Sequence, residues 1–165
     1  IPAGQTSAVF AQSPLQLQVG TVAGSIALTA TATAGGVPVT VANSTGTTVT
    51  LPEQPPTITN VSIVQVTSGF NVVVTGYSNT LDITQATFTF TPQPGDQLSS
   101  ATSTPAGVSG AFQTYFAGIS GSVGSQFMYT QPFTITAGSI STLQSLSVTL
   151  TNSQGTSPAT SPTNF

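Results

Sequence analysis

The sequence predicts an all-β protein, an immunoglobulin-like antiparallel β-sandwich preceded by a short, incomplete β unit. Apolar and polar residues alternate over many short stretches, which is the period of a strand with one buried face. Turn residues separate these stretches about every 8–12 residues, as in sandwich folds. Ser and Thr make up 52 of the 165 residues. They keep the outer face polar, and the β-branched Thr favours strands.

The first 55 residues contain only a few short strand patterns. Strands are predicted over residues 25–33, 37–41 and 47–51, and the turn Gly35-Gly36 makes the first two a hairpin. Residues 52–56 read PEQPP, and three prolines in five residues favour a stiff, extended linker over a central strand.

This linker divides the chain into an incomplete unit, residues 1–55, and a sandwich, residues 56–165. A unit of about 55 residues without disulfides is marginal by itself. Three explanations remain open. The chain is a fragment of something longer, or the first unit packs on another subunit, or it extends the sheet of the second.

The strand patterns after the linker are longer. Residues 67–69 and 92–96 are predicted turns, and residues 99–110 a loop or an edge strand. Pro132 places its strand at a sheet edge or a bulge. No helix is predicted, and the glycine-rich residues 118–124 are expected to form a turn or a flexible loop. The remaining strands are predicted over residues 58–66 (with a bulge), 70–77, 83–91, 126–135 and 143–151.

The residue types that are missing exclude most kinds of catalytic and binding site. The chain has no Lys, Arg, His, Cys or Trp, and its net charge is −3. It therefore lacks an ordinary general base near neutral pH, a Schiff-base amine, a thiolate and an imidazole metal ligand. Without cations it has no partner for phosphate, so nucleic acid is not expected. No apolar run approaches the roughly 18–20 residues of a membrane-spanning helix.

The three acids are Glu53, Asp82 and Asp96. Two of them could form a glycosidase-like pair, but Glu53 lies in the linker and Asp96 in a turn that favours Asp. Asp82 precedes a strand and is interpreted as a charge that protects an edge. Calcium sites use several clustered oxygen ligands, and these acids are far apart in the sequence. No enzyme activity, cofactor or metal site is predicted.

Aromatic residues and sequons give the remaining candidate sites. The aromatic group can form a sugar-stacking platform or the inward face of the sandwich. Tyr115 and Tyr129 are the candidate glycan contacts, since a phenol tolerates water. Asn43 and Asn60 begin N-x-Ser/Thr sequons and are candidate glycosylation sites. The aromatic group comprises Phe112, Tyr115, Phe116, Phe127, Tyr129 and Phe133.

Several segments together resemble a known family. They read IPAGQTSAVF, GTVAGSIALTATATAGGVPVT, PPTITNV, GSQFMYTQPFTI and LSVTLTNSQGTS. They are similar to the C-terminal tandem immunoglobulin-like β-sandwich modules of large secreted and surface proteins of soil bacteria. The resemblance implies an extracellular pair of sandwiches with a structural or adhesive role, and a first unit that has further strands before IPAGQ. Modules of this family normally keep some Arg and Asp on their surfaces, and this chain departs from that pattern.

Strand edges without charge lead to the functional prediction. Proteins usually guard edges with charged residues, and the strands over 29–33 and 37–41 have none. We expect strand addition between subunits, with residues 1–10 and 15–19 as the segments involved, unless the neighbouring strands lie upstream. The prediction is an extracellular or cell-surface structural module that builds or decorates a fibre or layer as a homo-oligomer or polymer. The alternative is a carbohydrate-binding, adhesive accessory domain of a secreted protein.

Overall fold

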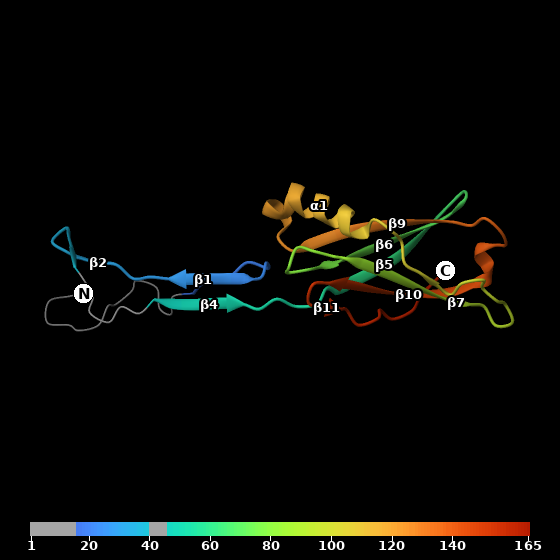
Figure 1. Cartoon of the computed structure of the whole chain (residues 1–165), viewed down its shortest axis with the longest axis horizontal. Helices are drawn as coiled ribbons and strands as arrows, with labels where there is room; N and C mark the ends of the chain where they lie inside the picture. The colour runs from blue at the N-terminus through green and yellow to red at the C-terminus, as the bar shows by residue number, and fades with distance from the viewer. Residues whose placement is uncertain (1–15, 40–45) are drawn as a thin grey trace.

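The computed structural model describes residues 16–39 and 46–165, without the side chains of residues 119–122. The molecule is elongated: a narrow arm, residues 16–39 and 46–51, leads into a body of two packed sheets, residues 57–165 (Figure 1). Every strand pair is antiparallel and only one α-helix occurs in the described part, so the all-β prediction is confirmed. Residues 1–10 and Asn43 lie outside the described residues, and residues 16–19 carry no strand.

The arm consists of two short ribbons. Gly35 and Gly36 both have positive φ, 58° and 83°, which is the turn geometry that a two-residue hairpin requires. The predicted hairpin is confirmed, but the strand expected over residues 25–33 is divided by residues 29–31. In the arm β1 pairs with β4 and β2 with β3; the bounds are β1 (Gly24–Leu28), β2 (Ala32–Ala34), β3 (Val37–Val39) and β4 (Thr47–Leu51).

The first sheet of the body has the order β5-β6-β9. Its register shifts between Ile58 and Asn60, which confirms the predicted bulge. β9 is an edge strand, as Pro132 predicted. On β9 Phe127 is buried, and the residues of even number face outward. The bounds are β5 (Thr57–Val66), β6 (Gly69–Tyr77) and β9 (Gln126–Thr134).

The second sheet has the order β11-β10-β7-β8, and β12 also pairs with β10. The predicted turn over residues 92–96 is confirmed, because the amide of Asp96 donates to the carbonyl of Gln93 at 2.9 Å. A single turn of 3₁₀ helix, Ile140–Thr142, precedes β10. The bounds are β7 (Gln85–Pro92), β8 (Thr102–Ser103), β10 (Leu143–Asn152), β11 (Gly155–Thr156) and β12 (Thr163–Asn164).

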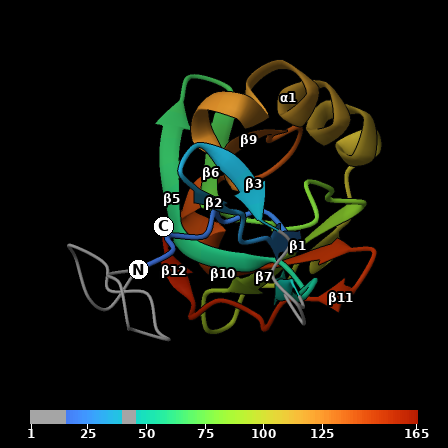
Figure 2. The same cartoon turned by 90° about the vertical axis from the view of Figure 1, so that its left-hand side faces the viewer.

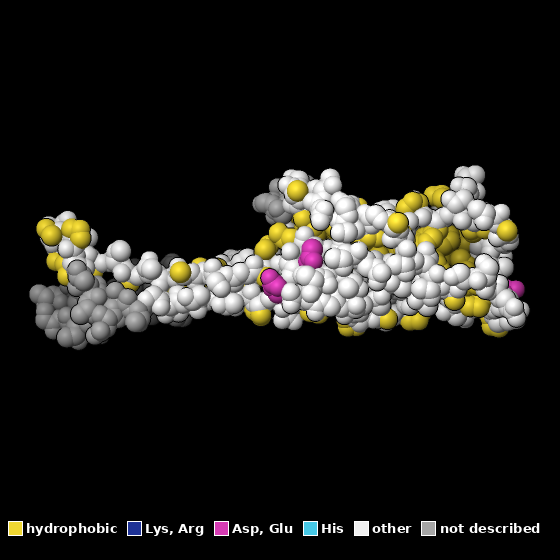
Figure 3. Space-filling model, in the orientation of Figure 1, with side chains coloured by type: hydrophobic (Ala, Val, Ile, Leu, Met, Phe, Trp, Pro, Cys, Tyr) yellow, Lys and Arg dark blue, Asp and Glu magenta, His cyan; other side chains and the backbone are white. Residues whose placement is uncertain are grey.

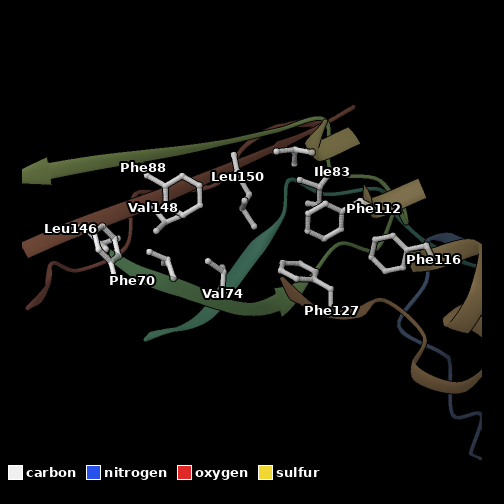
Figure 4. Close-up of a cluster of buried hydrophobic side chains, with 13 residues drawn as sticks. Phe70, Val74, Ile83, Phe88, Phe112, Phe116, Phe127, Leu146, Val148 and Leu150 are labelled. Atoms are coloured by element: carbon white, nitrogen blue, oxygen red, sulfur yellow. The ribbon is translucent and has the colours of Figure 1, made fainter. Parts of the chain in front are cut away.

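The core lies between the two sheets, which the view from the arm end shows on opposite sides (Figure 2). Burying one such side chain stabilises the fold by about 1.5–3 kcal/mol relative to exposure. Alternate residues of β6, β7 and β10 point inward, as their period-two patterns require (Figure 4). The buried apolar residues are Phe70, Val72, Val74, Ile83, Ala86, Phe88, Val108, Phe112, Phe116, Phe127, Leu146, Val148 and Leu150.

The helix α1 (Val108–Val123) corrects the sequence analysis, which predicted none. Val108, Phe112 and Phe116 recur every four residues and are all buried, so they form one apolar stripe. α1 contacts β9 of one sheet and β7 of the other, and closes one side of the sandwich. Residues 118–124 are therefore the end of this helix and the glycine that follows it. Gly124, at φ 61°, has the left-handed geometry of a helix C-terminus.

Candidate functional site

The β1–β4 ribbon has one apolar and one polar face. Ile26 lies opposite Val49, and Gly24 lies opposite Leu51. Since side chains alternate along a strand, Ile26, Leu28, Val49 and Leu51 share one face. Ile26 and Leu28 are 37% and 39% exposed, whereas Val49 and Leu51 are half-buried, so the described chain covers this face only in part. The opposite face carries Ser25, Ala27, Thr48 and Thr50.

The edges of this ribbon are open in the described part of the chain. There β1 has only β4 as a strand neighbour, and β4 has only β1. Farther out, Val37 of β3 is 64% exposed, and hydrophobic side chains are visible at the end of the arm (Figure 3). The chain has no lysine or arginine with which to guard these edges. Nothing in the charge of the arm opposes pairing with another strand.

Asn79 fastens the arm to the body. Its side-chain oxygen accepts from the amide of Gln54 at 2.9 Å, and its side-chain nitrogen donates to the carbonyl of Pro52 at 2.8 Å. Its backbone carbonyl accepts from the amide of Ala23, also at 2.8 Å. Ala23 precedes β1 and Pro52 follows β4, and because Gly24 pairs with Leu51 both lie at the same end of the ribbon. Asn79 therefore holds both strands of the ribbon at the end nearest the body. The loop after β6 thereby sets the direction in which the arm leaves the body.

Replacing Asn79 with Ala is expected to loosen the arm without unfolding the body. The substitution removes two of these three hydrogen bonds, each worth about 0.5–1.5 kcal/mol net. Residual dipolar couplings and ¹⁵N relaxation should then show the arm reorienting independently of the sandwich. Asn71→Ala, on β6 in the body, is the matched control and should leave the couplings unchanged. A rigid arm in Asn79→Ala would contradict the role given to this residue.

A second polar network surrounds Asn152, a buried residue at the end of β10. Its side-chain nitrogen donates to the carbonyl of Gln54 at 2.8 Å and to the hydroxyls of Thr80 and Ser78 at 2.8 and 3.2 Å. Its side-chain oxygen accepts from the amide of Gln154 at 2.8 Å. The network therefore joins the linker, the loop between β6 and β7, and the turn after β10.

The carboxylates take structural positions. Asp82 accepts from the amide of Ser153 at 2.9 Å and from the Thr80 hydroxyl. It therefore ties two loops together, which corrects its interpretation as an edge-protecting charge. Glu53 accepts from the side chain of Gln154 at 2.5 Å. Asp96 follows β7 at the end opposite Asp82, and among the described residues no three acidic, His or Cys side chains form a group suited to a metal.

The two tyrosines predicted as glycan contacts lie in different surroundings. Tyr129 points inward from β9 and packs on Phe112 with ring centroids 5.2 Å apart. Its hydroxyl donates to the side-chain oxygen of Gln131. Tyr115 is half-buried on α1, where its ring meets the edge of Phe116 at 5.3 Å. The aromatic group thus serves mainly as core, and Tyr115 is the member nearer the surface.

Burial raises the pKa of the Tyr129 phenol above its ordinary value of about 10. A raised folded-state pKa means that the unfolded chain ionises first, so this contribution to stability is present below pH 10 and lost above it. We expect the melting temperature to fall as pH rises from about 10, and to fall less steeply in Tyr129→Phe. Tyr115→Phe is the control. Equal slopes in wild type and Tyr129→Phe would contradict this account.

The sequence analysis did not single out Tyr77, at the end of β6. Its side chain is 43% exposed, and it lines a cavity of about 720 Å³ where the arm meets the body. It also lines a second cavity of about 370 Å³, to which Tyr115 contributes. A tyrosine at a strand end carries no distinctive local signal, because its surroundings come from distant segments.

Of the two sequons, only Asn60 falls within the described residues. It is exposed on β5, opposite Thr75 of β6. An exposed side chain is what a glycosylation site requires. Asn43 lies outside the described residues.

Comparisons with known proteins give no relatives. No family model, no curated protein and no solved structure matches the chain. Among the described residues, none of the helical segments has the length and apolar character needed to cross a membrane.

Proposed function

We propose that this protein is an extracellular structural module that builds or decorates a cell-surface fibre or layer. In this proposal the arm pairs with a second copy of the chain through β-strand addition. The observation that carries the proposal is the β1–β4 ribbon, whose apolar face is partly exposed and whose edges are open in the described part. An amphipathic two-stranded ribbon is marginal in water by itself and gains stability when it joins a larger sheet or covers its apolar face.

The strand order of the body supports an immunoglobulin-like sandwich as part of this proposal. Such folds place strands A, B and E in one sheet and C, F and G in the other. β5-β6-β9 takes the order A-B-E, and β7-β10-β11 takes the order C-F-G. The helix α1 then stands where strand D of an immunoglobulin domain would run. This order agrees with the resemblance to tandem modules of secreted soil-bacterial proteins, on which the extracellular location rests.

The energetics favour assembly through many weak contacts. Each backbone hydrogen bond added along a ribbon edge contributes about 0.5–1.5 kcal/mol net. Covering the apolar face adds about 25 cal/mol per Å² removed from water. Ordering two mobile partners costs several kcal/mol, so one ribbon pair is expected to associate weakly. A polymer or a surface layer repeats this contact and becomes stable through multivalency.

Two lysine substitutions on the same strand test the proposal by sedimentation velocity from micromolar to millimolar concentration. Ile26→Lys places a charge on the apolar face, and Ser25→Lys places the same charge on the hydroxyl face. Wild type is expected to associate as concentration rises. Ile26→Lys should shift this association to at least about tenfold higher concentration, equivalent to 1.4 kcal/mol, and Ser25→Lys should shift it less.

The body provides the folding control, since residue 26 lies outside the sandwich core. Both variants should therefore keep the amide spectrum of β5–β12. A wild type that stays monomeric at millimolar concentration, with the amides of β1 and β4 already protected from hydrogen exchange, would refute assembly through the arm.

A further inference from the structure

The cleft at the root of the arm has the form of a small-ligand site. Its volume is about 720 Å³, within the range of about 300–1,000 Å³ found for ligand pockets. Its walls come from five separate segments: Thr21 before β1, residues 54–57 of the linker and β5, the end of β6 with Asn79 of the following loop, the start of β9, and Pro158 after β11. The hydrogen bonds of Asn79 to the linker hold these walls in place.

Tyr77 is the central side chain of this surface. It lies opposite Gln126 in the β6–β9 register, and both residues line the root cleft and the neighbouring cavity of about 370 Å³. The two cavities therefore adjoin across this pair, and Tyr115 lines the far one. A partly exposed aromatic ring between two cavities provides an apolar face that an elongated ligand can cover on its way from one to the other.

Polar groups accompany the ring. The amide of Ser125 donates to the Thr21 hydroxyl at 3.2 Å, and its carbonyl accepts from the amide of Ser78 at 2.9 Å. The hydroxyl of Ser125 is buried and makes no hydrogen bond to any described residue. A buried polar group without a partner costs about 1–3 kcal/mol. Ser125 lines the root cleft but has no exposed surface, so a ligand hydroxyl offsets this cost once the Ser125 side chain rotates toward the cleft.

The chemistry of the walls selects a neutral ligand. None of the residues that line either cavity is charged, and the chain has no basic residue at all. Phosphate, sulfate and carboxylate ligands would lose hydration without gaining a counter-charge, and cations would find no carboxylate. A sugar ring has C–H groups that stack on a phenol face and hydroxyls that pair with amides and hydroxyls. We infer that the root cleft binds a neutral oligosaccharide, with Tyr77 as its stacking platform.

Amide NMR of the full chain tests the inference with two probes, the β-linked cellohexaose and the α-linked maltohexaose. At least one is expected to shift the amides of residues 54–57, 77 and 125–126. Tyr77→Ala should weaken its binding at least tenfold, whereas Tyr77→Phe should retain it, because the phenylalanine ring preserves the stacking face. Gln126→Ala, at an exposed position, should weaken it by a smaller factor and serves as a second variant if Tyr77→Ala loses the native amide dispersion.

Three outcomes would overturn the inference: no shifts with either hexasaccharide, shifts that Tyr77→Ala and Gln126→Ala leave unchanged, or shifts centred on Tyr129. A proline-rich decapeptide is a third probe, because prolines and an aromatic ring also form polyproline grooves. If only that peptide binds, the ligand of the root cleft is a proline-rich protein segment and not an oligosaccharide. The site is independent of assembly: Ile26→Lys should bind the oligosaccharide as wild type does, so either proposal can fail without the other.

Discussion

Replacing Asn152 with Ala is expected to lower the free energy of unfolding by about 3 kcal/mol. The side chain is buried and bridges the linker, two hydroxyls of the loop after β6, and the turn after β10. Alanine leaves the Gln54 carbonyl and the amides of Gln154 and Gly155 without this partner, and each lost hydrogen bond contributes about 0.5–1.5 kcal/mol net. The loop also holds Leu81 at φ 57°, a strained value for a residue with a side chain.

Urea denaturation followed by circular dichroism measures this effect. Asn60→Ala is the matched control, because Asn60 is exposed on β5 and its loss should change stability by less than about 0.5 kcal/mol. Comparable effects of the two substitutions would show that the network around Asn152 does not stabilise the fold. Asn152→Asp should be at least as destabilising at neutral pH, because it replaces a donor with a charge beside Asp82.

Replacing Gly76 with Ala should be about as costly, by 3 kcal/mol or more. A Cβ at this position would lie 2.2 Å from the Thr57 carbonyl oxygen and 2.9 Å from the ring of Phe127. Gly76 pairs with Phe127 across β6 and β9, so the ring packs on bare backbone. The backbone oxygen belongs to the bulged start of β5 and cannot move without disturbing the register there.

Gly110→Ala gives the opposite result and serves as the control. Gly110 lies in α1 with nothing within 4 Å of a built Cβ. Alanine there should stabilise the protein by up to about 1 kcal/mol, the difference in helix propensity between the two residues. Thermal unfolding of both variants distinguishes steric from conformational effects. If the Gly76→Ala and Gly110→Ala variants melted at the same temperature, the backbone around residue 76 would accommodate the added Cβ without cost.

The long strands of the body were predictable because their alternation depends on neighbouring residues. The alternation of Leu146, Val148 and Leu150 fixed which face of β10 is buried, and all three are inaccessible to solvent. The Gly35-Gly36 turn was equally local. The helix was missed although Val108, Phe112 and Phe116 have helical spacing, because glycines and serines between them disfavour helix. Tertiary packing on Phe127 and Tyr129 overrides that preference.

Some features of the candidate sites were also predictable from the sequence, and others were not. The uncharged edges of the arm followed from composition, since a chain without lysine cannot guard any strand with it. Tyr115 and Tyr129 were chosen because a phenol tolerates water, and the structure places one on a helix and the other facing the core. Tyr77 could not be chosen, because the cleft beside it is built from five segments of the chain.

By itself the sequence determined the excluded chemistry, the antiparallel β class and the inward face of β10, because composition and period two are local properties. Only the tertiary structure decided how the arm is fastened, where the cleft lies and what the carboxylates do. Those features join residues far apart in the chain: 25 positions for Gln54 and Asn79, 98 for Gln54 and Asn152, and 104 for Thr21 and Ser125. No pattern of neighbouring residues encodes such contacts, since they form only when the sheets pack.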